Sequence, residues 1–268
     1  MRILFLGDIV GNPGVQAVKS WLPKVLDRYS PDITIANAEN MAPNGRGFTE
    51  RQAEMLFDQE VDLLTMGNHV FDQREALPFI EHDRRVVRPA NFPSGAPGQG
   101  YTLCKVGGER IAVINLLGRA LMGDYDDPFR TADRILQEIG DQAKHIFVDF
   151  HAETTSEKAS LAHYLAGRVS AVVGTHTHVQ TADDRILPGG TAFLSDAGMC
   201  GPYESIIGFA KEGVIQRFLT QMPTRFEVPQ HTNTQLHGVF IETDANGRAT
   251  QIERVSITPD RPWNVWDN

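Results

Sequence analysis

The N-terminal part of the sequence alternates between short apolar runs and longer amphipathic segments. Short buried strands are expected at residues 2–6, 33–36 and 62–66, and a helix is expected at residues 13–29 between the first two strands. Pro13 fits an early helical position, because proline has no backbone N–H to donate there. Strand, helix and strand in succession are typical of parallel βαβ units with right-handed crossovers. The sequence therefore predicts an α/β fold.

The middle and the end of the sequence add hairpins to this pattern. A hairpin is expected over residues 103–115, and another is expected over residues 239–257. The middle of the chain is therefore expected to be more antiparallel, although strands are also expected at 146–150 and 171–173. The sequence shows no repeat, low-complexity segment or linker. Residues 1–268 are accordingly predicted to form a single domain.

Polar side chains stand directly after five of the expected strands. They are Asp8, Glu39 with Asn40, Asn68 with His69, His151, and His176 with His178. In open α/β sheets, ligands bind beyond the carboxyl ends of the strands, where such residues meet. Each of these residues alone has an ordinary interpretation as a helix cap, a loop residue or a buried histidine. Their repetition at five strand ends favours a shared binding site instead.

The residue types in this set indicate a metal site. Carboxylate, imidazole and amide oxygen without thiolate suit a divalent ion such as Mn, Fe, Co, Ni or Zn. The ligands are too many for one ion, and Glu39 can bridge two ions because each of its oxygens can bind one. Two ions about 3.5–4 Å apart can hold both oxygens of an in-line displacement at phosphorus. Other enzyme classes are disfavoured, because the sequence has no GxSxG elbow after a strand, no P-loop and no GxGxxG after a strand.

Residues close to His151 are expected to support the site without binding metal. Asp149 is expected to face away from His151 across the strand, which keeps Asp149 out of the ligand set. Glu153 and the segment 156–158 are expected to lie in a loop and a helix start near the site.

Net charge and composition limit the partners of the protein. The chain has a formal net charge of −9, which opposes non-specific binding to nucleic acid unless the fold hides a basic strip. A small phosphate-bearing substrate remains compatible if metal ions offset the charge. The two cysteines, Cys104 and Cys200, lie far apart in the sequence, which indicates neither a thiolate zinc site nor a disulfide framework. No apolar run approaches the ~20 residues of a membrane span. We expect a cytoplasmic protein without membrane association.

Several of these segments resemble the calcineurin-like metallophosphoesterase superfamily. The matching segments are Gly7-Asp8, Gly67-Asn68-His69, His151 and Gly174-Thr175-His176-Thr177-His178. The sequence is more closely similar to the YmdB-like family of bacterial phosphodiesterases. That similarity lies in Asn37-Ala38-Glu39-Asn40, residues 149–153 with 156–158, residues 174–181 with Asp183, and residues 196–199 with 201–202. The resemblance extends over nearly the whole chain.

The resemblance implies a four-layer α/β/β/α sandwich of two mixed sheets, with a dinuclear site that holds iron or manganese. It further implies that Asp8, Glu39 and His178 hold the first ion, and that Glu39, Asn68, His151 and His176 hold the second. His69 would contact the phosphate and could protonate the leaving oxygen. Family members of this type hydrolyse 2′,3′-cyclic nucleotides and related phosphodiesters and form oligomers, so a homo-oligomer is expected here.

Two positions depart from the wider superfamily. Its first motif is usually Asp-x-His, whereas Asp8 is followed here by Ile9 and Val10. The first ion therefore lacks one imidazole, and the amide oxygen of Asn40 is the expected replacement. The second motif supplies Glu39 where the superfamily has aspartate. More oxygen and fewer nitrogen ligands favour iron or manganese over zinc.

The expected function is hydrolysis of 2′,3′-cyclic nucleotides or related phosphodiesters, by attack of a metal-held hydroxide at phosphorus. Arg46 and the backbone N–H groups after Gly11 are candidate substrate contacts. Two alternatives stay open at this point. One is a phosphomonoesterase or protein phosphatase with the same metals, and the other is a regulatory protein that binds a cyclic nucleotide with little turnover. The fold alone does not separate them, because function depends on the site.

Overall fold

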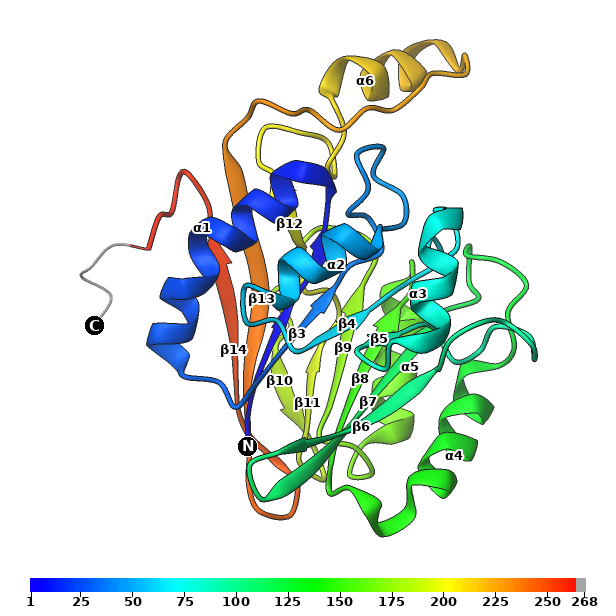
Figure 1. Ribbon diagram of the computed structural model, residues 1–268, viewed down its shortest axis with the longest axis vertical. Coiled ribbons are helices and arrows are strands. Elements are labelled where there is room, and N and C mark those ends of the chain that lie inside the picture. The colour runs from blue at the N-terminus through cyan, green and yellow to red at the C-terminus, as the bar shows by residue number, and fades with distance from the viewer. Residues whose placement is uncertain (264–268) are drawn as a thin grey trace.

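Two mixed β-sheets packed face to face form the centre of the computed structural model, which describes residues 1–263 (Figure 1). Among these residues, the first sheet has eight strands, in the order β2 (Asp8–Ile9), β12 (Met199–Pro202), β13 (Thr234–Thr243), β1 (Arg2–Leu6), β3 (Ile33–Asn37), β4 (Leu63–Thr65) and β5 (Val86–Val87), with β14 (Ala249–Ile257) also paired to β13. The second sheet has six strands, in the order β10 (Arg185–Leu187), β11 (Thr191–Leu194), β9 (Ala171–Thr175), β8 (His145–His151), β7 (Glu109–Leu117) and β6 (Tyr101–Val106).

Helices cover the outer face of each sheet. The first sheet is covered by α1 (Gly11–Tyr29), α2 (Glu50–Phe57) and α3 (Leu77–His82), and the second by α4 (Pro128–Ile139) and α5 (Thr155–Leu165). Short 3-10 turns lie at Arg74–Ala76 and Gly140–Gln142. The expected four-layer α/β/β/α sandwich is thereby confirmed. Within residues 1–263, no helix has both the length and the apolar character needed to cross a membrane.

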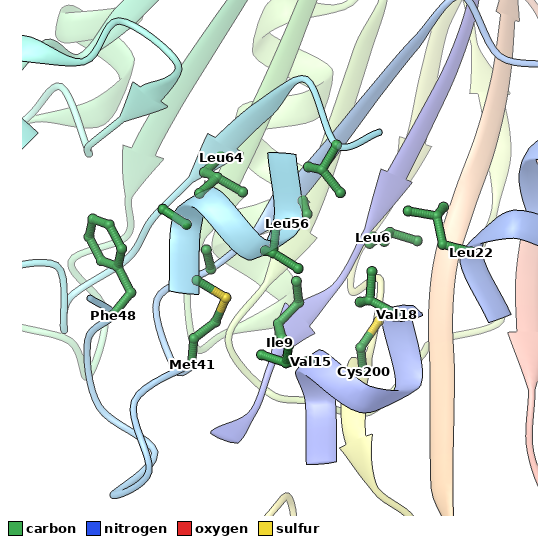
Figure 2. Close-up of a cluster of buried hydrophobic side chains, with 14 of the residues drawn as sticks. Leu6, Ile9, Val15, Val18, Leu22, Met41, Phe48, Leu56, Leu64 and Cys200 are labelled. Carbon is green, nitrogen blue, oxygen red and sulfur yellow. The ribbon is translucent and has the colours of Figure 1, made fainter. Parts of the chain in front are cut away.

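Alternation of side chains along the strands builds separate cores. On β1, Ile3 and Phe5 point into the space between the sheets, whereas Leu4 and Leu6 point toward the helices. Figure 2 shows part of the outer core, where Leu6 lies among side chains of α1 and α2. Between the sheets, the centre of the Phe5 ring lies 5.0 Å from that of Phe147. Burial of these apolar side chains supplies the main favourable contribution to folding.

The direction of the strands agrees with the sequence in one sheet and differs in the other. The predicted parallel units are confirmed, because β1, β3, β4 and β5 pair in parallel. The expectation of a more antiparallel middle was wrong. Strands β7, β8, β9 and β11 are also parallel, and within residues 1–263 antiparallel pairs of this sheet occur only at its β6 and β10 edges. For β7, β8 and β9 the reason is that α4 and α5 are crossovers, each of which returns the chain to the sheet in the same direction.

One segment that the sequence pattern did not reveal extends away from the sandwich. Residues 203–233 connect β12 to β13 and contain α6 (Lys211–Thr220), which stands apart from the two sheets at the top of Figure 1. Large apolar side chains of this segment face solvent, and Phe218 is 76% and Leu219 80% exposed. Exposed apolar side chains that gather in one place are typical of an interaction surface.

Replacement of Leu194 by alanine is expected to lower the free energy of unfolding by about 2–5 kcal/mol, because Leu194 is fully buried between the sheets. Leu121→Ala removes the same atoms from a side chain that is 87% exposed, and it is expected to cost less than about 0.5 kcal/mol. Urea unfolding followed by circular dichroism measures both values. An equal decrease in the free energy of unfolding in the two variants would contradict the prediction that burial of Leu194 between the sheets stabilises the fold.

Candidate metal centre

The carboxyl ends of strands from both sheets meet at one edge of the sandwich. Strands β1, β3 and β4 end there in the first sheet, and β8 and β9 end there in the second. All of the predicted site residues lie at these ends: Asp8, Glu39, Asn40, Asn68 and His69 from the first sheet, and His151, His176 and His178 from the second. The site is therefore shared between the two sheets.

One group of potential ligand atoms surrounds Nε2 of His151. That nitrogen lies 3.1 Å from Oε1 of Glu39, 3.2 Å from Oδ1 of Asn68 and 3.0 Å from Nδ1 of His176. Glu39, His151 and His176 each offer one ligand atom, and these atoms lie within 4.8 Å of one another. This spacing and these atom types fit one ion held by two imidazoles, a carboxylate and an amide oxygen.

A second group lies beside it, around Nε2 of His178. Oδ1 of Asn40 is 3.2 Å from that nitrogen, and Oδ1 of Asp8 is 4.0 Å from it. This Asp8 oxygen is buried and has no hydrogen-bond partner in residues 1–263. The other Asp8 oxygen accepts the backbone N–H of His176 at 3.1 Å, which links the two groups. A buried carboxylate oxygen without a partner is costly unless a cation lies against it.

Two of the histidines are oriented by hydrogen bonds that point away from the site. Nδ1–H of His178 donates to the carbonyl of Ile207 at 2.9 Å. Nε2–H of His176 donates to Oε2 of Glu153 at 3.1 Å, which places Glu153 beside the site as expected. A carbonyl and a carboxylate can only accept, so each bond fixes the tautomer of its ring. The second nitrogen of each ring then directs a lone pair into the site.

His151 is oriented by a chain of buried polar side chains. Its Nδ1 donates to Oγ1 of Thr175 at 2.9 Å, and Thr175 donates in turn to Asp149 at 2.7 Å. Asn37 of the first sheet donates to the same carboxylate at 2.9 Å. The expectation that Asp149 faces away from His151 was wrong, because residues two apart on a strand share a face. Asp149 is the acceptor that keeps the Nε2 lone pair of His151 directed into the site.

The atoms that face into the site are therefore acceptors. Lone pairs of three imidazoles meet the carboxylates of Asp8 and Glu39 and the amide oxygens of Asn40 and Asn68. Such groups repel one another unless a proton or a metal ion lies between them, so this set of residues fits divalent ions. Gly67 leaves the room that the cluster needs, because a Cβ built there would lie 2.2 Å from Oε2 of Glu39.

The pKa values of the site residues show how the buried carboxylates and histidines affect one another's charge. Burial by itself would raise the pKa of Glu39 and lower that of His151, but their mutual attraction outweighs it. The pKa of Glu39 falls to about 2, and that of His151 rises to about 9, so a proton on His151 takes the place of a cation beside Glu39 in the metal-free chain. Burial and repulsion from His151 together lower the pKa of His176 to about 3. Burial raises the pKa of Asp8, so Glu39 is the carboxylate that is held ionised and attracts positive charge.

A buried ion pair holds the loop that carries His176 and His178. Nζ of Lys158 lies 2.7 Å from Oδ2 of Asp196, and both side chains are buried. The same carboxylate accepts the backbone N–H of Thr177 at 3.0 Å and its hydroxyl at 2.8 Å. His176 and His178 have φ angles of 102° and 65°, which residues other than glycine rarely adopt. The ion pair therefore stabilises a strained segment in the shape that turns both rings inward.

His69 lies at the mouth of the site. Its backbone N–H donates to Oε2 of Glu39 at 3.0 Å, and its ring Nδ1 lies 2.9 Å from Oδ2 of Asp72. The His69 side chain is 25% exposed, whereas that of His151 is fully buried. A histidine in this place can reach a substrate at the metal edge while Asp72 orients its ring.

The chain is similar to bacterial phosphodiesterases and phosphatases. A family model described as YmdB-like protein matches residues 4–255. The 2′,3′-cyclic-nucleotide 2′-phosphodiesterase of Bacillus subtilis (strain 168) is 50% identical over 261 residues, which are 97% of this chain and 98% of that protein. The crystal structure of a novel phosphatase from Mycoplasma pneumoniae is 35% identical, with a TM-score of 0.91 and coverage of 96% of this chain and 93% of that chain. The NAD nucleotidase of Haemophilus influenzae is 14% identical, has a TM-score of 0.60 over 96% of this chain and 56% of that chain, and shows the fold alone.

Replacement of Lys158 by methionine is expected to lower the free energy of unfolding by about 3–5 kcal/mol, because Asp196 would remain as an unpaired buried charge. The affinity for manganese is expected to fall about 10–100-fold, since the loop would no longer hold two of the predicted ligands in place. Urea unfolding and titration calorimetry measure the two effects. Lys105→Met, on the exposed hairpin, is the matched control. An unchanged manganese affinity in Lys158→Met would contradict the positioning role.

Proposed function

The chain belongs to the YmdB-like family, and on that premise we propose that it is a two-metal phosphodiesterase acting on 2′,3′-cyclic nucleotides or related phosphodiesters. The observation that carries the proposal is the convergence of buried acceptor atoms from both sheets around two neighbouring positions. The activity named for the Bacillus subtilis relative supports the choice of substrate class.

The two positions differ in the ligands that they offer. Glu39, Asn68, His151 and His176 would hold one ion. Asp8, Asn40 and His178 would hold the other, with Glu39 as the shared ligand. The second set contains one imidazole and several oxygens, and such a set favours iron or manganese over zinc. The metals proposed for the protein are therefore iron or manganese.

The chemistry is divided between the ions and the protein. When bound, two such ions would supply the positive charge that activates a water and offsets the charge on the phosphate. His69, at the mouth, stabilises the charge that develops or donates a proton to the departing ribose oxygen. Thr175 and Asp149 keep His151 in the tautomer that it needs, and Glu153 does so for His176.

A cyclic diester suits the site better than a monoester for an electrostatic reason. A 2′,3′-cyclic phosphate carries ring strain and one negative charge, whereas a monoester is a dianion near neutral pH. In a chain of net charge −9, the smaller charge costs less to bring to a site that already contains buried carboxylates. Phosphomonoesterase activity and binding without turnover are the alternatives that the experiment below separates.

We also propose that the protein is cytoplasmic and forms a homo-oligomer. Both cysteines are free thiols, which supports a reducing compartment. The exposed apolar side chains of α6, Ile215, Phe218 and Leu219, support a contact with a second copy of the chain.

Replacement of Glu39 by glutamine is expected to reduce the hydrolysis of 2′,3′-cyclic AMP to the background rate and to lower the manganese content, because the bridging charge is lost. Glu81→Gln, on the surface of α3, is the control and is expected to keep both the hydrolysis rate and the manganese content of the unaltered protein. Full activity in Glu39→Gln would contradict the bridging role. Faster turnover of a nucleoside monophosphate than of the cyclic diester would favour a phosphomonoesterase, and two bound ions without any turnover would favour a regulatory protein.

Replacement of His69 by asparagine is expected to lower kcat for 2′,3′-cyclic AMP by about 10²–10⁴-fold, because the group that assists the leaving oxygen is removed. The manganese content is expected to stay the same, since the His69 ring is not one of the predicted ligands. Steady-state kinetics and metal analysis of the same preparation measure the two quantities. A variant that loses manganese together with activity would show that His69 is a metal ligand.

Light scattering after size exclusion is expected to give a mass above the 29.7 kDa of one chain. Combined replacement of Phe218 and Leu219 by serine is expected to shift the mass toward that of one chain, because these side chains lose their apolar contact area. A monomeric mass for the unaltered protein would reject the homo-oligomer.

A further inference from the structure

An arginine-rich cavity lies beside the candidate metal centre, between α6 and the loop that follows β3. Its volume is about 440 Å³, and it is lined by Arg46, Arg217 and Arg225 together with Phe209 and Phe226. The centres of the two phenylalanine rings lie 5.6 Å apart. The cavity thus joins three cationic side chains to a small aromatic wall.

Residues next to the lining of this cavity are hydrogen-bonded to predicted metal ligands. The carbonyl of Gly45, whose next residue lines the cavity, accepts from Nδ2 of Asn40 at 2.9 Å. The carbonyl of Ile207, two residues before Phe209, accepts from Nδ1 of His178 at 2.9 Å. A molecule whose phosphate lies at the metal centre can therefore extend into the cavity while it stays in contact with the protein.

The three arginines of the cavity lack acidic partners within residues 1–263. Their guanidinium groups form no ion pair with an Asp or Glu, whereas Arg85 lies 2.8 Å from Glu54. All three side chains are exposed, so the fold does not need them for its core. In a chain of net charge −9, three unpaired guanidinium groups around one cavity indicate that a negatively charged ligand completes the site.

The opposite side of the metal centre is acidic. A backbone N–H of the loop after β7 donates to the carbonyl of His151 at 2.9 Å, which places this loop beside the site. A second cavity in the loop is lined by Asp124 and Asp126, and its one arginine, Arg119, already pairs with Asp127. A further negative group on the substrate is therefore attracted to the arginine-rich cavity and repelled from the opposite side.

We propose that the arginine-rich cavity binds the 5′-phosphate of a nucleotide whose 2′,3′-cyclic phosphate lies at the metal centre. This inference rests on the proposed function and narrows its substrate class to nucleotides with a 5′-phosphate, either free or linked to a preceding nucleoside. Guanidinium groups bind phosphate oxygens through paired N–H donors. The rings of Phe209 and Phe226 offer an aromatic surface for a base beyond that phosphate.

Three substrates of the manganese-loaded protein test the proposal. They are adenosine 2′,3′-cyclic phosphate, the same nucleotide with a 5′-phosphate, and the adenosine dinucleotide that ends in a 2′,3′-cyclic phosphate. The two substrates with a 5′-phosphate are expected to have a kcat/KM about 10–100-fold higher than the first. A higher kcat/KM for the dinucleotide than for the nucleotide with a free 5′-phosphate would assign the cavity to the end of an oligonucleotide. A lower kcat/KM for the dinucleotide would assign the cavity to a mononucleotide.

Arginine variants connect this preference to the cavity. Combined Arg46→Gln, Arg217→Gln and Arg225→Gln substitutions are expected to bring the ratio of kcat/KM values close to one. Arg110→Gln, at the start of β7 and exposed, is the matched control and is expected to keep the preference. A ratio near one in the unaltered protein, or an unchanged ratio in the triple variant, overturns the proposal.

Binding to the metal-free protein separates this inference from the proposed function. Adenosine 3′,5′-bisphosphate is expected to bind about tenfold more tightly than adenosine 3′-phosphate in titration calorimetry, and the triple variant is expected to lose the difference. A binding difference without hydrolysis of any of the three substrates would reject the phosphodiesterase and keep the phosphate site. Equal binding of the two ligands would reject the phosphate site, whatever the turnover.

Discussion

Repulsion between acceptor groups at the sheet edges is the constraint on which the site depends. The carboxylates of Asp8 and Glu39 and the ring nitrogens of three histidines face one another across a small buried space. Such an arrangement is unfavourable by itself, and it persists because the fold fixes each group from behind. The unfavourable energy becomes binding energy when cations enter. The same repulsion between these side chains therefore lowers the stability of the metal-free chain and raises its affinity for metal ions.

The contacts that fix these groups are themselves buried and polar. Asn37 joins the first sheet to the second by donating to Asp149, which orients a predicted ligand through Thr175. Lys158 on α5 pairs with Asp196 and so holds the loop after β9 in a strained shape. Each contact needs both partners, because either one alone would be an unpaired polar group in the interior. The functional region is therefore much larger than the set of groups that would touch a metal.

Most of the site could be predicted from the sequence, because a polar residue after an apolar strand is a local pattern, as at Glu39. The pairing of Lys158 with Asp196 could not be predicted, because nothing in the sequence around Lys158 indicates that Asp196 is its partner. The direction of β8 and β9 was missed for a similar reason, because a neighbouring hairpin is a strong local signal and a crossover is a long-range one. The cavity joins Arg46 to Arg217, and only the completed fold places those residues together.

The place of β13 in the first sheet has a consequence for how the protein matures on the ribosome. This late strand lies between β1, the earliest strand, and β12, which pairs with the short strand that contains Asp8. The first sheet can therefore be completed only after β13 has been translated, long after its early strands. The second sheet, with its histidines, can assemble sooner because all its strands come from residues 101–194. The complete site therefore forms only after β13 has been translated, although every predicted ligand precedes that strand in the sequence.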